Sequence, residues 1–107
     1  MREEIKPVRL QLSRKKGFKL ESPNGLPIVI VDRRNKKYGN PFIVGVDGDQ
    51  KQCVLQFKVA AYNTPDFLSE VRRELRDKNL ACWCKIWDEK GLRVPCHADV
   101  LLKLANA

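Results

Sequence analysis

The sequence predicts an α/β fold, a single compact domain in which a small β-sheet packs with about three helices. A chain of 107 residues has the length of one domain, so residues 1–107 are expected to fold as a unit. Short apolar runs bounded by turn residues are typical of strands. They alternate with longer segments whose apolar residues recur at helical spacing. Strands separated by helices favour an α/β arrangement.

Two strands are predicted in the first third of the chain. Residues 8–12 alternate apolar and polar side chains, as a half-buried strand does. The expected inward side chains are Val8, Leu10 and Leu12, and the expected outward ones are Arg9 and Gln11. Beyond the turn residues at 23–25, the β-branched run 28–31 predicts a strand buried on both faces. A polar, basic loop follows at 32–38, and Gly39 after it permits a positive φ.

Two helices are predicted next. Residues 50–62 follow the turn 47–49 and carry apolar residues at helical spacing. Their main stripe is Val54, Phe57 and Ala61, with Leu55, Val59 and Tyr62 beside it. Thr64 is expected to cap a second helix that begins at Pro65. That helix is expected to end near Asn79, because asparagine tolerates the left-handed conformation.

The last third of the chain predicts a strand, a hairpin and a helix. Residues 80–83 form a short apolar run that is expected to be a buried strand. Residues 85–95 contain turn residues between two apolar pairs, which predicts a hairpin. Residues 97–104 have helical spacing, and residues 1–6 are expected to be a flexible N-terminus.

Charge and motif content limit the classes of function. The net charge is +8, and residues 1–37 hold 11 Lys/Arg against 4 Asp/Glu, so an anionic partner is expected there. A solvated basic face is the alternative interpretation.

The sequence has no Walker loop and no Gly-x-Ser-x-Gly, which excludes the commonest nucleotide-hydrolase and serine-hydrolase motifs. Without a membrane-length apolar run or a signal-peptide pattern, the sequence predicts no membrane association and a cytoplasmic location.

Four residues near the C-terminus form a candidate zinc site: Cys82, Cys84, Cys96 and His97. Alternation along a strand places Cys82 and Cys84 on one face. Three thiols and an imidazole are the four ligands that a closed tetrahedral zinc site requires, although Cys-x-Cys is an unusual spacing. The competing interpretation is packing, since free cysteine behaves as a small hydrophobic residue. Cys53, alone within an apolar helix stripe, is assigned to packing.

A reactive thiol is the third interpretation of the same residues. Cys96 lies where the last helix begins, beside His97, and both features are expected to lower a thiol pKa. A Cys–His pair can serve as a nucleophile and its base. Asp99 in the first turn opposes a thiolate there and suits ribose hydroxyls, or the orientation of His97, better.

Three motifs occur in order along the chain. Arg-Lys-Lys-Gly-Phe occupies residues 14–18, and residues 34–42 end in Gly-Asn-Pro-Phe. Cys-Trp-Cys at 82–84 precedes Pro-Cys-His-Ala-Asp-Val-Leu at 95–101. In these motifs the chain resembles the DUF4326 family of small uncharacterised proteins, common in bacteria and bacteriophages. The resemblance runs from about Val8 to the C-terminus.

Two departures from the family pattern stand out. The family has tryptophan where this chain has Tyr38. It also joins the last two cysteine motifs through fewer residues, so the resemblance identifies 85–95 as a hairpin insertion beside the site.

Residue chemistry and family motifs coincide at nine candidate ligand-binding positions. Arginine binds phosphate through a planar fork, aromatic rings stack on bases, and asparagine hydrogen-bonds to base edges or ribose. The candidates are Arg14, Lys16, Phe18, Arg34, Tyr38, Asn40, Trp83, His97 and Asp99.

These residues predict binding, without turnover, of a phosphorylated nucleotide-derived small molecule. The family's occurrence in phages adds the expectation that such binding sequesters a host nucleotide immune signal. One alternative is a zinc-stabilised nucleic-acid-binding module, and another is a nucleotide- or nucleoside-processing enzyme that uses Cys96 and His97. A protein-interaction role for Trp87 is a further alternative. A small binding domain can form its pocket between subunits, so a homo-oligomer is compatible with this sequence.

Overall fold

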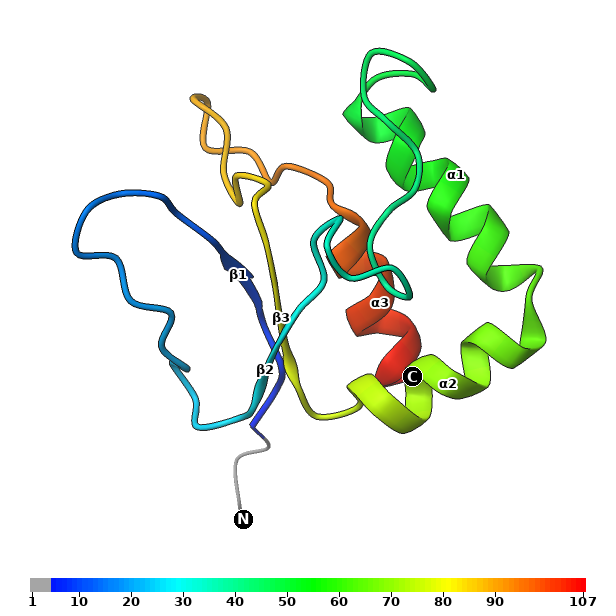
Figure 1. Ribbon diagram of the computed structural model, residues 1–107, viewed down its shortest axis with the longest axis horizontal. Coiled ribbons are helices and arrows are strands. Elements are labelled where there is room, and N and C mark those ends of the chain that lie inside the picture. The colour runs from blue at the N-terminus through cyan, green and yellow to red at the C-terminus, as the bar shows by residue number, and fades with distance from the viewer. Residues whose placement is uncertain (1–4) are drawn as a thin grey trace.

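A parallel three-stranded sheet forms one side of the domain (Figure 1). The computed structural model describes residues 5–107. Its strands are β1 (Arg9–Gln11), β2 (Ile28–Ile30) and β3 (Asn79–Cys82). They lie in the order β1-β3-β2, so that β3 pairs with both neighbours.

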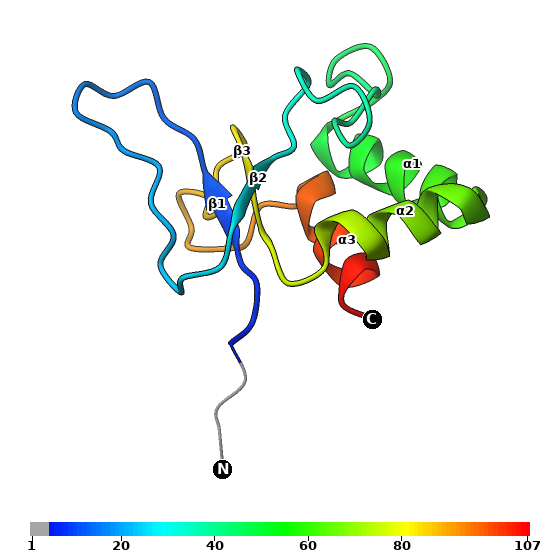
Figure 2. The ribbon, with the colours of Figure 1, turned by 60° about the horizontal axis from the view of Figure 1, so that its bottom comes forward.

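Three helices cover one side of this sheet. They are α1 (Gln50–Tyr62), α2 (Pro65–Leu75) and α3 (His97–Ala105). α3 contacts the sheet, and α1 and α2 pack against α3 (Figure 1). The long loop between β1 and β2 lies on the other side of the sheet from the helices (Figure 2). The predicted α/β domain with a small sheet and three helices is therefore confirmed. No helix in the described residues has the length and apolar character needed to cross a membrane.

The core lies between β3, α3 and the inner faces of α1 and α2. Its largest fully buried apolar side chains include Leu75, Leu80, Leu101, Val31 and Val71. Burial of a side chain of this kind stabilises the fold by about 1.5–3 kcal/mol.

The central strand is β3, not the β-branched run at 28–31. All four residues of β3 are buried, whereas Ile30 in β2 is 37% exposed. The prediction that 28–31 is buried on both faces is wrong, because β2 is an edge strand paired only with β3. The run 80–83 is confirmed as a buried strand up to Cys82.

Arg9 is buried, although strand alternation predicted it to point outward. Its side chain has no exposed surface, while Val8, predicted inward, is 38% exposed. The hairpin 85–95 explains the difference, because the Arg9 guanidinium donates to the carbonyls of Lys85 and Val94, each at 2.8 Å.

α1 begins as predicted, after the turn that ends at Asp49. The Asp49 carboxylate accepts from the backbone N–H of Gln52, and the Gln52 side chain accepts from the backbone N–H of Asp49, each at 2.8 Å. This reciprocal capping box satisfies two backbone donors at the helix start. Phe57 and Ala61 are buried as expected, but the neighbouring Leu55, Val59 and Tyr62 are each about half exposed.

The boundaries of α2 differ from the prediction. Thr64 occupies the N-cap position, but its hydroxyl donates to the carbonyl of Ala60 in α1, so its side chain does not cap α2. α2 ends at Leu75, and Asp77 adopts the left-handed conformation (φ 59°) that was expected of Asn79. Asn79 is instead fully buried at the start of β3.

The predicted hairpin at 85–95 is confirmed. Trp87 and Arg93 form an antiparallel bridge, and the backbone N–H of Asp88 donates to the Leu92 carbonyl at 2.9 Å. Trp87 is 60% exposed. Of the N-terminal segment expected to be flexible, residues 1–4 lie outside the described residues.

Candidate functional site

A pocket opens at the carboxyl ends of the strands. Its volume is ≈ 610 Å³, within the range of small-molecule sites. Ligands of α/β proteins commonly bind at this edge, because the loops there vary without disturbing the core. Loops after all three strands and the first turns of α1 and α3 form its wall. The lining residues are Arg14, Asp32, Arg33, Arg34, Asn40, Phe42, Val44, Gln50, Cys53, Cys82, Trp83, Cys84 and His97.

Asp32 organises the mouth of this pocket. Its buried carboxylate accepts from the Arg34 side chain (Nε at 2.9 Å) and from the indole N–H of Trp83, also at 2.9 Å. The hydrogen bond from Arg34 is the main cause that holds the pKa of Asp32 below its usual value, against the opposing effect of burial, and the Trp83 indole adds to it. Asp32 therefore fixes the orientation of a guanidinium and an aromatic ring at once.

The lowered pKa of Asp32 predicts a pH-dependent stability. In the unfolded chain this carboxyl group takes up its proton near pH 3.8, before the folded protein does. Its contribution to the free energy of unfolding is complete above that pH and is lost as the pH falls through the folded pKa. In urea titrations at about pH 7 and about pH 3, we expect wild type to lose more stability than Asp32→Asn. Equal losses of stability in the two proteins would show that the hydrogen bonds to Asp32 contribute nothing to the free energy of unfolding.

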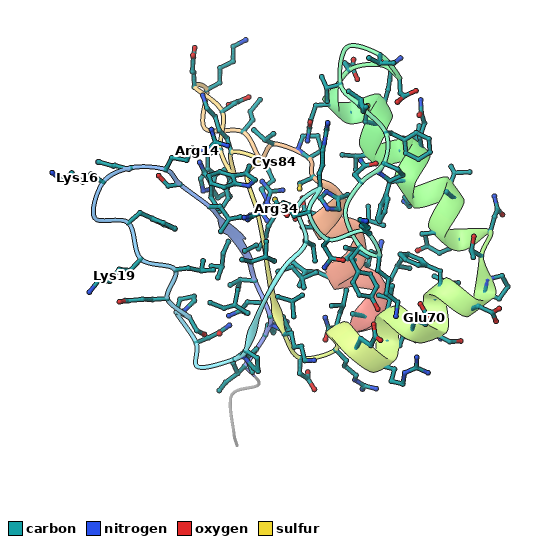
Figure 3. The ribbon with its side chains drawn as sticks, in the orientation of Figure 1. Arg14, Lys16, Lys19, Arg34, Glu70 and Cys84 are labelled. Atoms are coloured by element: carbon teal, nitrogen blue, oxygen red, sulfur yellow. The ribbon has the colours of Figure 1, made fainter. Side chains whose placement is uncertain are left out.

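Three arginines contribute positive charge to the pocket. Arg34 is paired with Asp32 at 2.7 Å, yet its side chain is 71% exposed. Within residues 5–107, neither Arg14 nor Arg33 forms an ion pair with a protein carboxylate. The Arg14 guanidinium lies 5.1 Å from the centre of the Trp83 ring. Figure 3 shows Arg14 and Arg34 gathered near Cys84 at this edge of the sheet.

Asn40 and Gly39 shape the loop rather than offer free groups to a ligand. The Asn40 amide donates to the Cys53 carbonyl at 3.2 Å and accepts from the Phe42 N–H at 2.9 Å. A Cβ at Gly39 would lie 2.4 Å from the Asp32 carbonyl oxygen. Glycine is therefore required there by close approach, not by the positive φ that the sequence suggested.

Three thiols meet at the base of the pocket. The sulfur atoms of Cys82, Cys84 and Cys96 all lie within 4.8 Å of one another, and only that of Cys84 is half-buried rather than buried. Hydrogen bonds from Cys82 and Cys96 lower the pKa of Cys84, and the same contacts raise the pKa of Cys82 and Cys96. The expected activation of Cys96 is therefore wrong. Its neighbours stabilise the Cys84 thiolate instead.

His97 lies beside this cluster. Its Nε2 is 2.6 Å from the carbonyl oxygen of Val31, and its Nδ1 is 3.6 Å from Cys96 Sγ. Burial is the main cause that lowers the pKa of His97, so the ring is neutral at neutral pH. The ring edge packs against Phe57, with centroids 5.4 Å apart.

Four of the nine candidate ligand-binding residues lie away from the pocket. Lys16 and Phe18 lie exposed on the loop after β1, and Lys16 points away from the strand ends (Figure 3). Tyr38 is buried, and its hydroxyl donates to Glu74 on α2. Asp99 pairs with Arg9 at 2.5 Å and with Arg93 at 3.1 Å, so it does not orient His97. Five candidates line the pocket together: Arg14, Arg34, Asn40, Trp83 and His97.

Sequence reasoning did not single out several lining residues. Asp32 and Arg33 belong to the loop that was recognised as basic, and their position directly after a strand was the available signal. Gln50 is the first residue of α1, and its amide donates to the Pro95 carbonyl at 2.7 Å and to Cys84 Sγ at 3.5 Å. No local sequence pattern predicts the contact between Gln50 and Cys84, which are 34 residues apart.

Comparison with known proteins identifies a family for this chain. No curated protein and no solved structure matches it. The family model of a domain of unknown function, DUF4326, matches residues 10–107, nearly the whole chain. The protein thus belongs to the DUF4326 family.

Proposed function

We propose that this domain binds a phosphorylated, nucleotide-derived small molecule in the pocket and does not convert it. The observation that carries the proposal is the convergence of three arginines and an exposed tryptophan on a nucleotide-sized pocket at the strand ends. We further propose that it acts in the cytoplasm. Binding without turnover would sequester the ligand, the role that the family's occurrence in phages suggested.

The arginines support recognition of phosphate. Arg14 and Arg33 have no carboxylate partner in the described chain, so their guanidinium groups are available to an anion. Arg34 is held in place by Asp32 but remains largely exposed. Guanidinium groups make paired hydrogen bonds to phosphate oxygens, which are stronger than those between neutral groups.

Trp83 supports recognition of a flat base. Its ring is 41% exposed, and the indole hydrogen bond to Asp32 holds the ring in one orientation. Stacking of a base on an aromatic ring contributes about 1–3 kcal/mol in nucleic-acid complexes. The exposed Arg14 guanidinium lies over this ring, 5.1 Å from its centre, so a cation and an aromatic face are available side by side.

The state of three titratable groups favours binding over catalysis. Asp32 is engaged by Arg34 and Trp83, and His97 Nε2 is engaged by the Val31 carbonyl. Cys96, the candidate nucleophile, is fully buried. These groups are poorly placed to accept a proton from a ligand or to attack it.

A thermal-shift screen tests this proposal. The panel contains nucleoside mono-, di- and triphosphates, dinucleotides and cyclic dinucleotides. We expect a saturable rise in Tm with one class, and recovery of that nucleotide unchanged after long incubation. Arg33→Ala and Arg14→Ala should each raise its Kd about 10- to 100-fold, since a hydrogen bond to a charged group contributes about 1.5–3 kcal/mol.

Lys16→Ala is the matched control. Lys16 lies two residues beyond Arg14 on the same loop, carries the same charge and does not line the pocket. Its replacement should leave Kd nearly unchanged. An equal loss of affinity in Lys16→Ala and Arg14→Ala, with steep salt dependence, would instead favour the nucleic-acid-binding alternative. A chemically altered nucleotide would favour the enzyme alternative, and a panel without any saturable shift would rule out the proposal for these ligand classes.

A further inference from the structure

We propose that Cys82, Cys84, Cys96 and His97 bind one Zn²⁺ at the base of the pocket. The three sulfur atoms lie within 4.8 Å of one another. His97 lies outside this group, with its Nδ1 3.6 Å from Cys96 Sγ, so its ring must shift toward the other two sulfur atoms to bind the same ion. The inference is independent of the proposed ligand, because it depends on none of the pocket arginines.

Two distances from Cys96 Sγ are close to those between the ligands of a tetrahedral zinc ion. Zn–S bonds of about 2.3 Å and Zn–N bonds of about 2.0 Å place neighbouring ligand atoms about 3.5–3.8 Å apart. The distance of 3.6 Å between Cys96 Sγ and His97 Nδ1 lies in that range. The sulfur atoms of Cys82 and Cys96 are 3.0 Å apart, well beyond the length of a disulfide bond. They need to separate by less than about 1 Å to admit the metal.

The hydrogen bond of His97 selects the tautomer that a metal ligand needs. The Val31 carbonyl oxygen can only accept a hydrogen bond, so His97 Nε2, at 2.6 Å, must carry the proton. Nδ1 is then the ring nitrogen left to bind a metal, and it lies 3.6 Å from Cys96 Sγ. Histidine ligands of zinc usually donate their second ring N–H to a carbonyl or carboxylate in this way.

Two further donors support bound thiolates. The amide of Gln50 lies 3.5 Å from Cys84 Sγ, and the backbone N–H of Ala98 lies 3.5 Å from Cys96 Sγ. N–H donors stabilise the negative charge of a thiolate that ligates a metal. The ligands come from the end of β3 and the start of α3, so zinc would join the two segments that flank the hairpin 85–95.

Cobalt substitution and metal analysis test the site. Protein expressed with added zinc and purified under reducing conditions, without chelator, should contain one zinc per chain by native mass spectrometry. After removal of zinc, Co²⁺ alone should give the visible absorption of a tetrahedral ion and a thiolate charge-transfer band. A chain without zinc and without these bands would overturn the proposal, and so would one carrying an intact Cys82–Cys96 disulfide. Zinc and a co-purified nucleotide add different masses, so the two proposals succeed or fail separately.

Two cysteine variants assign the ligands. Cys84→Ser is the most informative variant. Cys84 is the one half-buried thiol of the cluster, so its replacement disturbs the core less than replacement of Cys82 or Cys96. Its zinc affinity should fall more than about 100-fold, since the loss of an outer-shell partner alone costs about 10- to 100-fold. Cys53→Ser is the matched control, because Cys53 lies in α1 outside the cluster and should keep its zinc. Zinc retained by Cys84→Ser, or lost only in Cys53→Ser, would contradict the assignment. If Cys84→Ser does not fold, the cobalt spectrum of wild type decides alone.

Discussion

Replacement of Arg9 by methionine is expected to lower the free energy of unfolding by about 2–4 kcal/mol, because a fully buried guanidinium and its hydrogen bonds to a carboxylate and two carbonyls would be lost. Arg9 has no exposed side-chain surface, and its guanidinium binds the Asp99 carboxylate at 2.5 Å. It also donates to two carbonyls of the hairpin, Lys85 and Val94. Methionine preserves the packing of the apolar stem but leaves the two carbonyls without the guanidinium donor, and it leaves Asp99 with Arg93 alone.

Arg93→Met provides a matched control, because Arg93 binds the same carboxylate. Its side chain is 46% exposed and lies 3.1 Å from Asp99. Exposed pairs contribute about 0–1 kcal/mol, so this variant should lose no more than that. Urea unfolding of both variants measures the difference. Equal losses of unfolding free energy in the two variants would show that the burial of Arg9 does not strengthen its interaction with Asp99.

Features specified by local sequence were predicted well. α1 was placed correctly because the capping residue Asp49 and the apolar spacing lie within the helix and the turn before it. The proximity of Cys82 and Cys84 was also predicted, but from strand alternation; because β3 ends at Cys82, a bend at residues 83–84 brings the two sulfur atoms together instead. The hairpin 85–95 was marked by its own turn residues.

Features that depend on distant segments were not predictable. Arg9 is buried because a hairpin more than 70 residues later in the chain covers it. A side chain that strand alternation predicted to be exposed therefore lies in the interior. The run 28–31 has the composition of a central strand, yet strand order is set by which segments pair, and β3 took the central position. Tyr38 lies in a motif loop, but its ring turns toward Phe67 in the core, with centroids 5.9 Å apart, rather than toward the pocket.

Replacement of Asn79 by leucine should destabilise the fold by about 1–3 kcal/mol, because the hydrogen bonds made by this fully buried side chain would be lost. Asn79 is fully buried, and its side-chain oxygen accepts from the backbone N–H of Val8 at 3.0 Å. Its amide nitrogen donates to Asn24 at 2.8 Å and to Ser22 at 3.2 Å. Through these hydrogen bonds the Asn79 side chain connects the central strand both to the residue before β1 and to the turn before β2.

Asn106→Ala is the control for this variant, because Asn106 also makes side-chain hydrogen bonds, two in number, but is exposed. It accepts from the backbone N–H of Asp77 at 3.0 Å and donates to the Leu102 carbonyl at 2.8 Å. Water replaces these bonds, so the expected loss is about 1 kcal/mol or less. Similar losses for Asn79→Leu and Asn106→Ala in urea unfolding would contradict the assigned role of Asn79.

The position of Asn79 also separates stability from function. Asn79 begins β3, whereas the pocket and the thiol cluster lie where β3 ends. In folded Asn79→Leu protein, the zinc content and the Kd of a pocket ligand should therefore match those of wild type, although Tm is lower. A variant that loses metal or ligand in proportion to its stability would show that the two ends of the sheet are coupled. Unchanged binding would show that the carboxyl-end loops form the site independently of the contacts that hold the sheet together.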